Sequence, residues 1–336
     1  MIGFVYHVAR TARPRQWLKN LALLAAPVFA GVLFEQGIAL QMTKAFICFC
    51  AIASAGYYIN DIVDAPKDRL HPVKKNRAIA SGKISTKLAW IIAWVTALFA
   101  ILFGYVFVGR FFSFMVIAYL VLQLIYSFYI RNVIILDALT VATLFIFRVI
   151  SGALAVEVSV SSWLILATIG LSLLLAFGKR RSEKTLLMQH QKDSKLTRET
   201  LRHYPDTLLD SMISMSASFC IITYALFTFQ VSPESLDPTI AQFLPSILRG
   251  PKLMMLSIPI VIYGVARYLY VIYEKKEGES PARVLLSDKP LLVSVVIWGL
   301  FIVGLVNLPP FVGKYWDNKT TKSSSIKESQ RLDTIK

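Results

Sequence analysis

The residues best suited to chemistry lie in one polar stretch that follows a long apolar run. The stretch Tyr57–Gly82 contains Asn60, Asp61, Asp64 and Asp68 in the pattern NDxxDxxxD. Offsets of three and four place side chains on one face of a helix, so the spacing predicts an acidic stripe. Carboxylates with an amide oxygen suit Mg²⁺ held together with substrate phosphates. We therefore predict that these four residues bind Mg²⁺ and that the three aspartates take part in catalysis.

A solvated helix end with capping acids is the alternative explanation of this stripe. It is less favoured because carboxylates at the edge of an apolar span are costly unless they are used. Pro66 lies inside the pattern, and a proline in a helix removes a hydrogen bond and clashes with the preceding turn. We therefore expect the helix to kink or end near Pro66, with Asp68 on the loop that follows.

Cations come directly after the acidic stripe. A diphosphate bound to a metal still carries negative charge, which Lys74 and Arg77 are placed to neutralise. Anchoring by the positive-inside rule would also put cations here, but it does not require acidic residues beside them. His71 has no second His or Cys at metal-ligand spacing, so we do not expect it to bind a metal.

The elements that must position these residues are strongly apolar. Hydrophobic residues make up 56 % of the 336-residue chain and charged residues 17 %, with a mean hydropathy of +0.59. Soluble domains are roughly 45–50 % apolar and about 25 % charged. The composition excludes a disordered chain and predicts an all-α, polytopic membrane protein. Nine stretches are apolar enough to span a bilayer: roughly 20–36, 42–59, 88–108, 111–130, 133–156, 161–178, 207–229, 253–273 and 291–312.

The net charge of +16 indicates anionic lipid headgroups and phosphate-bearing substrates as partners. Nucleic acid is not expected, because no nucleic-acid-binding signature interrupts the apolar spans. Most Lys and Arg residues lie in the N-terminal segment and in the long loops 60–87, 179–206 and 274–290. The positive-inside rule places these parts in the cytoplasm.

Residues 1–313 are expected to form one transmembrane transferase domain, and residues 314–336 a basic, disordered tail. Nine spans would put that tail outside the cell, which its six Lys or Arg residues disfavour. Eight spans would remove this conflict. An assembly of several copies of the chain is compatible with the sequence.

The acidic stripe after the second span resembles the first aspartate-rich motif of the UbiA superfamily of intramembrane prenyltransferases. The segment Arg13–Asn20 (RPRQWLKN) is similar to the opening segment of that superfamily, and nine helices also fit. The resemblance implies a UbiA-like bundle of about nine transmembrane helices with a Mg²⁺-dependent transferase site.

One departure narrows the resemblance. Members carry a second motif, about DxxxD, after helix six, where this chain has GKRRSE from Gly178 to Glu183. Cations there suit direct binding of an anion. The departure resembles the decaprenyl-phosphate phosphoribosyltransferase branch, which also has a segment similar to Arg148–Gly152 (RVISG). Segments around Arg267 and at Leu285–Lys289 are similar to that branch as well.

The branch implies transfer of 5-phosphoribose from phosphoribosyl diphosphate to a polyprenyl phosphate, with release of diphosphate, for the synthesis of cell-envelope polysaccharide precursors. A phosphate acceptor is already anionic and needs no strong base. Two alternatives stay open. An aromatic prenyltransferase would use polyprenyl diphosphate and a 4-hydroxybenzoate-like acceptor, and would want the second acidic motif. A lipid carrier without chemistry would not need the acidic stripe.

The resemblance and the charges suggest roles for the remaining polar residues. Lys19, Lys74 and Arg77 are expected to neutralise phosphate oxygens. Lys179 and Arg180 are expected to receive the ribose 5-phosphate.

Glu183 is expected to act in catalysis by contacting either a ribose hydroxyl or Lys179, one helical turn away. Tyr126 and Arg148 lie in or at the ends of spans and are expected to bind substrate. A charged residue within a span is a functional candidate by default. The alternative for Arg148 is an ion pair with Asp137 or Glu157.

Overall fold

The computed structural model describes residues 2–70, 74–189, 204–230, 253–275 and 281–307, and every regular element in these ranges is a helix. This confirms the predicted all-α class. The elements are α1 (Ile2–Thr11), the 3₁₀ helix η1 (Pro14–Leu24), α2 (Ala25–Phe29), α3 (Ile38–Asp68), η2 (Lys74–Asn76), α4 (Thr86–Phe107), α5 (Arg110–Phe128), η3 (Ile130–Asn132), α6 (Leu136–Ala155), α7 (Ser162–Gln189), α9 (Asp206–Gln230), η6 (Leu253–Ser257), α11 (Ile258–Tyr270), the π-helical turn η7 (Val271–Lys275) and α12 (Pro281–Ser287), followed by a helix over Lys289–Asn307.

Eight helical stretches in the described ranges are long and apolar enough to cross a membrane, which confirms a polytopic membrane protein. The predicted span 20–36 is the one that differs. It contains the end of η1 and the five-residue α2. Pro27 cannot donate a hydrogen bond to the preceding turn, and Gly31 adopts a φ of +73°, so a long regular helix does not form here.

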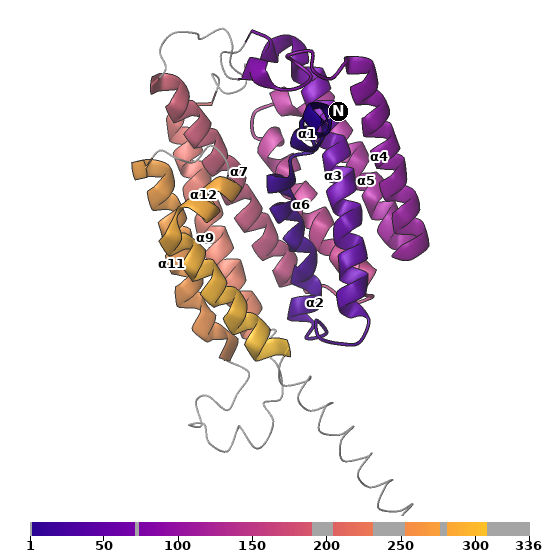
Figure 1. Ribbon diagram of the computed structural model, residues 1–336. Coiled ribbons are helices and arrows are strands. Elements are labelled where there is room, and N and C mark those ends of the chain that lie inside the picture. Colours follow the sequence, from indigo (N-terminus) through magenta and orange to yellow (C-terminus); the bar gives the residue numbers. More distant parts are fainter. Residues whose placement is uncertain (1, 71–73, 190–203, 231–252, 276–280, 308–336) are drawn as a thin grey trace, which may run out of the picture.

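The helices form two groups on either side of α6 (Figure 1). Helices α3, α4 and α5 lie together, and α7, α9 and α11 lie together. Between them, η1 packs against both α3 and α6. The two groups have separate hydrophobic clusters, one centred on α3 to α5 and the other on α7, α9 and α11. The acidic stripe on α3 and the GKRRSE segment on α7 therefore belong to different helix groups, with η1 and α6 between these groups.

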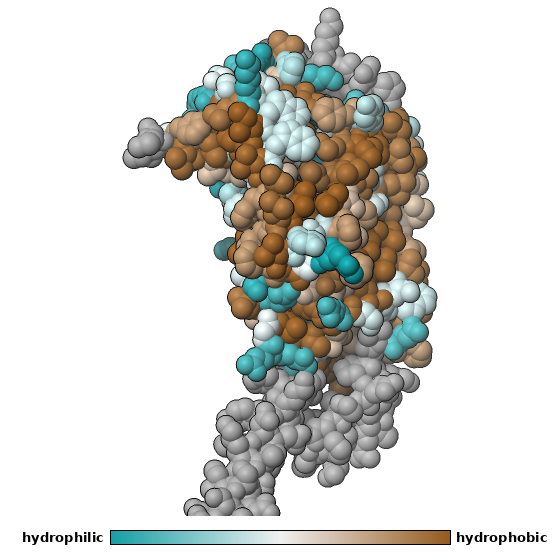
Figure 2. All heavy atoms as spheres, turned by 90° about the vertical axis from the view of Figure 1, so that its right-hand side faces the viewer, coloured by the Kyte–Doolittle hydropathy of each residue, from teal (hydrophilic) through white to brown (hydrophobic). Residues whose placement is uncertain are grey.

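Helix α4 shows how the sequence separates protein from lipid. Ala89, Ala93 and Ala97 are buried at four-residue spacing, where small side chains let α4 approach α3 closely. On the other face, Trp94 and Leu98 are exposed, as a lipid-facing surface requires. Figure 2 shows the result as a broad hydrophobic band with hydrophilic patches above and below it.

Candidate active site

The acidic stripe lies on the last two turns of α3. The helix continues through Pro66 and ends at Asp68, so the expectation that Asp68 lies on the following loop was wrong. The proline sits in the final turn, where it removes a single backbone hydrogen bond, and the Arg69 N–H still donates to the Ala65 carbonyl at 3.1 Å. Asp61 and Asp68 are buried, and Asp64 is partly exposed.

Each aspartate of the stripe is paired with an arginine from another part of the chain. Arg13, just before η1, forms an ion pair with Asp61. Arg77, just after η2, donates to Asp68 at 2.7 Å and to Asp61 at 3.2 Å. In η3, Arg131 forms an ion pair with Asp64. Three separate connections between helices therefore supply arginines to the stripe. Their positive charges offset the repulsion among the three carboxylates.

The donor set fits a magnesium ion that is shared with a substrate. No cluster of three metal-ligating side chains is gathered in the described ranges. Magnesium, however, commonly binds through one or two carboxylates and completes its shell with phosphate oxygens and water. A guanidinium nitrogen of Arg77 already lies between Asp61 and Asp68, so this space accommodates a positive charge between two carboxylates.

Two other predicted residues near the stripe differ in their surroundings. Asn60 faces α5, and its amide oxygen accepts a hydrogen bond from the Ser127 hydroxyl. Lys74 is exposed in η2, within electrostatic reach of Asp68. Lys74 is thus placed to meet a phosphate from the solvent side, whereas Asn60 ties the acidic helix to α5.

A second group of cations faces this region from η1, α6 and α7. Lys19 is partly buried in η1 and feels the charges of Lys179, Arg148 and Arg13. Burial and then these three cations lower the pKa of Lys19 from 10.5 to about 7. An anion bound among these four cations would relieve their mutual repulsion.

Arg148 carries its charge into the centre of the bundle. It is buried, and it donates to the Asn20 amide oxygen at 3.0 Å, to the Leu144 carbonyl at 2.9 Å and to the Tyr119 hydroxyl at 2.6 Å. These acceptors are uncharged, so the positive charge is held in place without being neutralised. The alternative pairing of Arg148 with Asp137 was wrong, because Asp137 binds Arg180 instead.

The approach of η1 to α6 depends on Gly152, one helical turn after Arg148. A Cβ atom at this position would lie 1.9 Å from the Leu23 carbonyl oxygen. We expect Gly152→Ala to lower the free energy of unfolding by about 3 kcal/mol, because η1 must move away from α6. Thermal unfolding in detergent measures the effect, and Gly299→Ala, with open space around it, is the control. Equal stability of both variants would contradict this packing.

The GKRRSE segment lies on α7, and its cations point in two directions. Lys179 pairs with Glu183 at 3.4 Å, which is the predicted contact one turn away. Arg180 is buried and donates to Glu183 at 2.7 Å and to the Tyr126 hydroxyl at 3.4 Å. Arg181 faces away and pairs with two aspartates at the start of α9. The predicted pair Lys179 and Arg180 is therefore on the site side of α7, and Lys179 is the more exposed of the two.

Four residues with a role in this arrangement were not among the predicted site residues. They are Arg13, Arg131, Asp137 and Tyr204. Arg13 lies in the RPRQWLKN segment, and Arg131 is the single cation of a short connection between two apolar spans, so both had a usable signal in the sequence. Asp137 and Tyr204 are far apart in the chain and are joined only by the fold.

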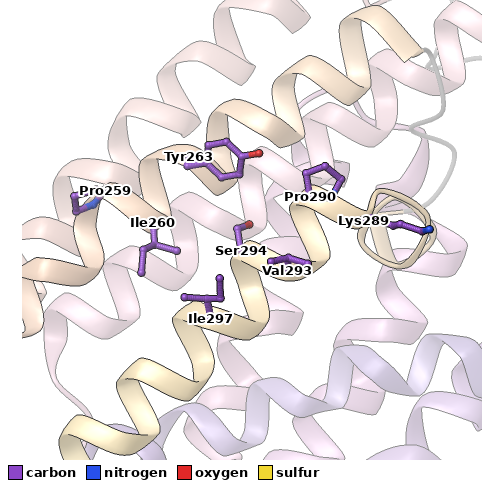
Figure 3. Close-up of a pocket in the computed structure, with 8 residues that line it drawn as sticks. All are labelled: Pro259, Ile260, Tyr263, Lys289, Pro290, Val293, Ser294 and Ile297. Atoms are coloured by element: carbon purple, nitrogen blue, oxygen red, sulfur yellow. The ribbon is translucent and has the colours of Figure 1, made fainter.

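Arg267 and Asp288 pair with each other. Arg267 on α11 makes two parallel hydrogen bonds of 2.9 Å to Asp288, which also accepts the Leu291 N–H at the start of the last described helix. This pair fastens two membrane-spanning helices together. An open groove of about 650 Å³ lies between the same two helices, with Tyr263 and Lys289 on its walls (Figure 3). None of the predicted site residues lines it.

Comparison with known proteins decides the family. The model of the UbiA prenyltransferase family matches residues 24–287. The chain belongs to this family. The UbiA assignment confirms the resemblance seen in the acidic stripe, and it makes the chain a membrane-embedded transferase.

Similar proteins and structures agree with the UbiA assignment. The decaprenyl-phosphate phosphoribosyltransferase of Corynebacterium glutamicum is 32 % identical over 304 residues, which cover 90 % of this chain and 87 % of that protein. The Mycobacterium tuberculosis protein of the same name is 29 % identical, covering 88 % and 93 %. A UbiA homolog from Archaeoglobus fulgidus bound to GPP and Mg²⁺ has the same fold, with a TM-score of 0.65, 16 % identity, and coverage of 89 % of this chain and 99 % of that one.

Proposed function

We propose that the protein transfers the 5-phosphoribosyl group of phosphoribosyl diphosphate to a polyprenyl phosphate of the decaprenyl type and releases diphosphate. The observation that carries this proposal is the pairing of an acidic stripe on α3 with a crowded group of cations on η1, α6 and α7. A substrate with a diphosphate at one end and a further phosphate at the other matches both parts of the site. The names of the 29–32 % identical relatives support the same reaction.

The diphosphate end is assigned to the acidic stripe. Asp61, Asp64 and Asp68, with Asn60, would hold Mg²⁺, and the ion would stabilise the negative charge that develops on the leaving diphosphate. Arg77, between two of the carboxylates, and the exposed Lys74 are placed to neutralise phosphate oxygens. The A. fulgidus homolog bound to Mg²⁺ and GPP supports a divalent metal in this fold.

The ribose 5-phosphate end is assigned to the cations opposite. Lys179 and Lys19 would bind the phosphate oxygens, and the fixed charge of Arg148 would raise the local concentration of anions. Glu183 would accept a hydrogen bond from a ribose hydroxyl. Tyr126 accepts a hydrogen bond from Arg180 and would line the pocket that holds the sugar.

The step itself needs little from the protein beyond binding and charge stabilisation. A phosphate oxygen of the lipid forms a bond to C1 of the ribose, and the bond from C1 to the diphosphate oxygen breaks. Positive charge develops on C1 and the ring oxygen as negative charge grows on the diphosphate. The attacking phosphate monoester is already deprotonated at neutral pH, so no side chain must remove a proton.

The proposed orientation follows the charges. The acidic stripe and the GKRRSE segment would face the cytoplasm of a bacterial cytoplasmic membrane, where a soluble sugar phosphate is available, while the lipid enters from the bilayer. The product would serve as a precursor of a cell-envelope polysaccharide. The basic tail 314–336 lies outside the described residues.

Release of diphosphate tests the proposal. Purified protein in detergent with Mg²⁺ should release it only when phosphoribosyl diphosphate and polyprenyl phosphate are both present. Release from polyprenyl diphosphate with 4-hydroxybenzoate, and none from the first pair, would overturn the proposal in favour of aromatic prenyl transfer. Uptake of lipid phosphate into vesicles without any diphosphate release would instead indicate a carrier.

The pKa of Lys19 predicts a pH dependence of donor binding. Because its pKa is lowered to about 7, Lys19 loses its charge between about pH 6 and 8 in the free enzyme. We expect the KM for phosphoribosyl diphosphate to rise over this interval, since a neutral amine attracts phosphate less than an ammonium. Lys19→Gln should have a higher KM that changes less with pH. Parallel pH profiles for both proteins would contradict this role.

A further inference from the structure

Asp137 lies at the start of α6, within a chain of contacts that runs from the core to the proposed donor site. Its carboxylate is 1 % exposed and accepts hydrogen bonds from Arg180 Nε and from the Tyr204 hydroxyl, both at 2.7 Å. Arg180 in turn donates to Glu183, and Glu183 pairs with Lys179. Exposure increases along this chain, from a fully buried tyrosine to a lysine whose side chain is 39 % exposed.

The second partner of Asp137 fixes the carboxylate from the other side. Tyr204 is fully buried just before α9, and its oxygen also accepts the N–H of Ile135 at 2.6 Å. Burial, together with the hydrogen bond to Asp137, raises the pKa of Tyr204 above its ordinary value, so the hydroxyl remains a donor throughout the neutral range. Asp137 therefore has one oxygen for Tyr204 and the other for Arg180.

The charges explain why this matters at the site. Arg180 has two carboxylate partners, Asp137 in the core and Glu183 toward the site. While Asp137 holds the guanidinium from behind, Glu183 can also pair with Lys179. Without the charge of Asp137, Glu183 would be the remaining counter-ion of a buried arginine and would be drawn away from Lys179, since an unpaired buried charge is costly.

We propose that Asp137 and Tyr204 are positioning residues that act through Arg180 to hold Glu183 and Lys179 in the geometry that binds the phosphoribosyl donor. The inference rests on the proposed function. Both residues are too buried to touch a substrate, and the side-chain contacts of Asp137 lead through Arg180 to Glu183 and Lys179. Their loss should therefore weaken donor binding and leave lipid binding unchanged.

Steady-state kinetics of Asp137→Asn test the proposal. The amide keeps an oxygen for Tyr204 but loses the charge that faces Arg180. We expect the KM for phosphoribosyl diphosphate to rise about 10–100-fold, by analogy with the loss of affinity when the hydrogen-bonding partners of metal ligands are removed. The KM for polyprenyl phosphate and kcat should change less than threefold, as an order-of-magnitude bound. An unchanged donor KM would overturn the proposal.

A double variant separates positioning from a general loss of structure. If Asp137 acts through Glu183, Asp137→Asn should add little to the donor KM of a Glu183→Gln protein. If the two substitutions raise the donor KM by independent factors that multiply in the double variant, the proposal is overturned. Asp288→Asn is the matched control, because Asp288 is also buried and paired with one arginine, Arg267. It should lower thermal stability without raising the donor KM.

Tyr204→Phe provides the second route if Asp137→Asn does not fold. It removes one hydrogen bond to Asp137 and keeps the charge, so the donor KM should rise in the same direction by about three- to tenfold. A donor KM equal to that of the wild type in this variant would overturn the proposal. No transfer by the wild-type protein would overturn the proposed function itself, which distinguishes the two failures.

Discussion

Replacing Asp64 with asparagine is expected to lower kcat/KM about 1,000-fold, equivalent to about 4 kcal/mol of transition-state stabilisation. Asp64 is the least buried carboxylate of the stripe, and it is paired with Arg131. An amide at this position would weaken Mg²⁺ binding and remove the ion pair between Asp64 and Arg131. Diphosphate release by purified protein, measured over a range of Mg²⁺ concentrations, gives the effect.

Asp210→Asn is the matched control for this substitution. Asp210 lies on α9, is paired with Arg181 and accepts a hydrogen bond from Tyr273, but it faces away from the acidic stripe. It should retain kcat/KM within about threefold while losing some stability, as is usual for an exposed ion pair. Comparable losses of activity in both variants would show that the acidic stripe has no special role.

The second large effect is expected for Lys179→Ala. We expect the KM for phosphoribosyl diphosphate to rise about 10–100-fold, because one charge-assisted hydrogen bond to a phosphate contributes about 1.5–3 kcal/mol. The KM for the lipid should stay the same, since Lys179 is assigned to the ribose 5-phosphate. Initial rates at varied donor concentration measure the change.

Arg181→Ala tests whether position on α7 determines this effect. Arg181 lies two residues further along the helix, and it pairs with Asp206 and Asp210 on α9. Its loss should lower the thermal midpoint slightly, because partly exposed ion pairs contribute little to stability. The donor KM should stay within about twofold, because Arg181 pairs with α9 and not with the proposed donor site. A rise of donor KM that is equal in both variants would contradict the assignment of Lys179.

Most of the fold could be predicted from hydropathy, because long apolar runs in a bilayer have few alternatives to a helix. The predictions of helix boundaries were wrong at prolines and glycines, whose effect depends on their position in the folded helix. Asp68 is the last residue of α3 and does not lie on the loop, because Pro66 falls in the last turn, where little of the helix remains to be disrupted. The expected span 20–36 was too regular, because Pro27 and Gly31 interrupt it.

The acidic stripe was predictable because its spacing is a local property of one helix. The partners of the stripe were not predictable, since Arg13 is brought to Asp61, and Arg131 to Asp64, only by the packing of separate elements. The same limit applies to Arg148, because Asp137, one of the two acidic partners considered as an alternative for it, pairs with Arg180 instead. A sequence shows which charges are costly in a membrane, and the fold determines which of them meet.

We propose that the protein uses a ribosyl diphosphate as donor and a lipid phosphate as acceptor. This proposal is tested most directly by incubating the purified protein with Mg²⁺, ribose-labelled phosphoribosyl diphosphate and polyprenyl phosphate, then extracting the lipid for mass spectrometry. We expect a labelled lipid that is heavier by one phosphoribosyl group, and we expect it to be absent with EDTA and in the Asp64→Asn protein. An unlabelled lipid from the wild-type protein, with Mg²⁺ and several chain lengths supplied, would contradict it.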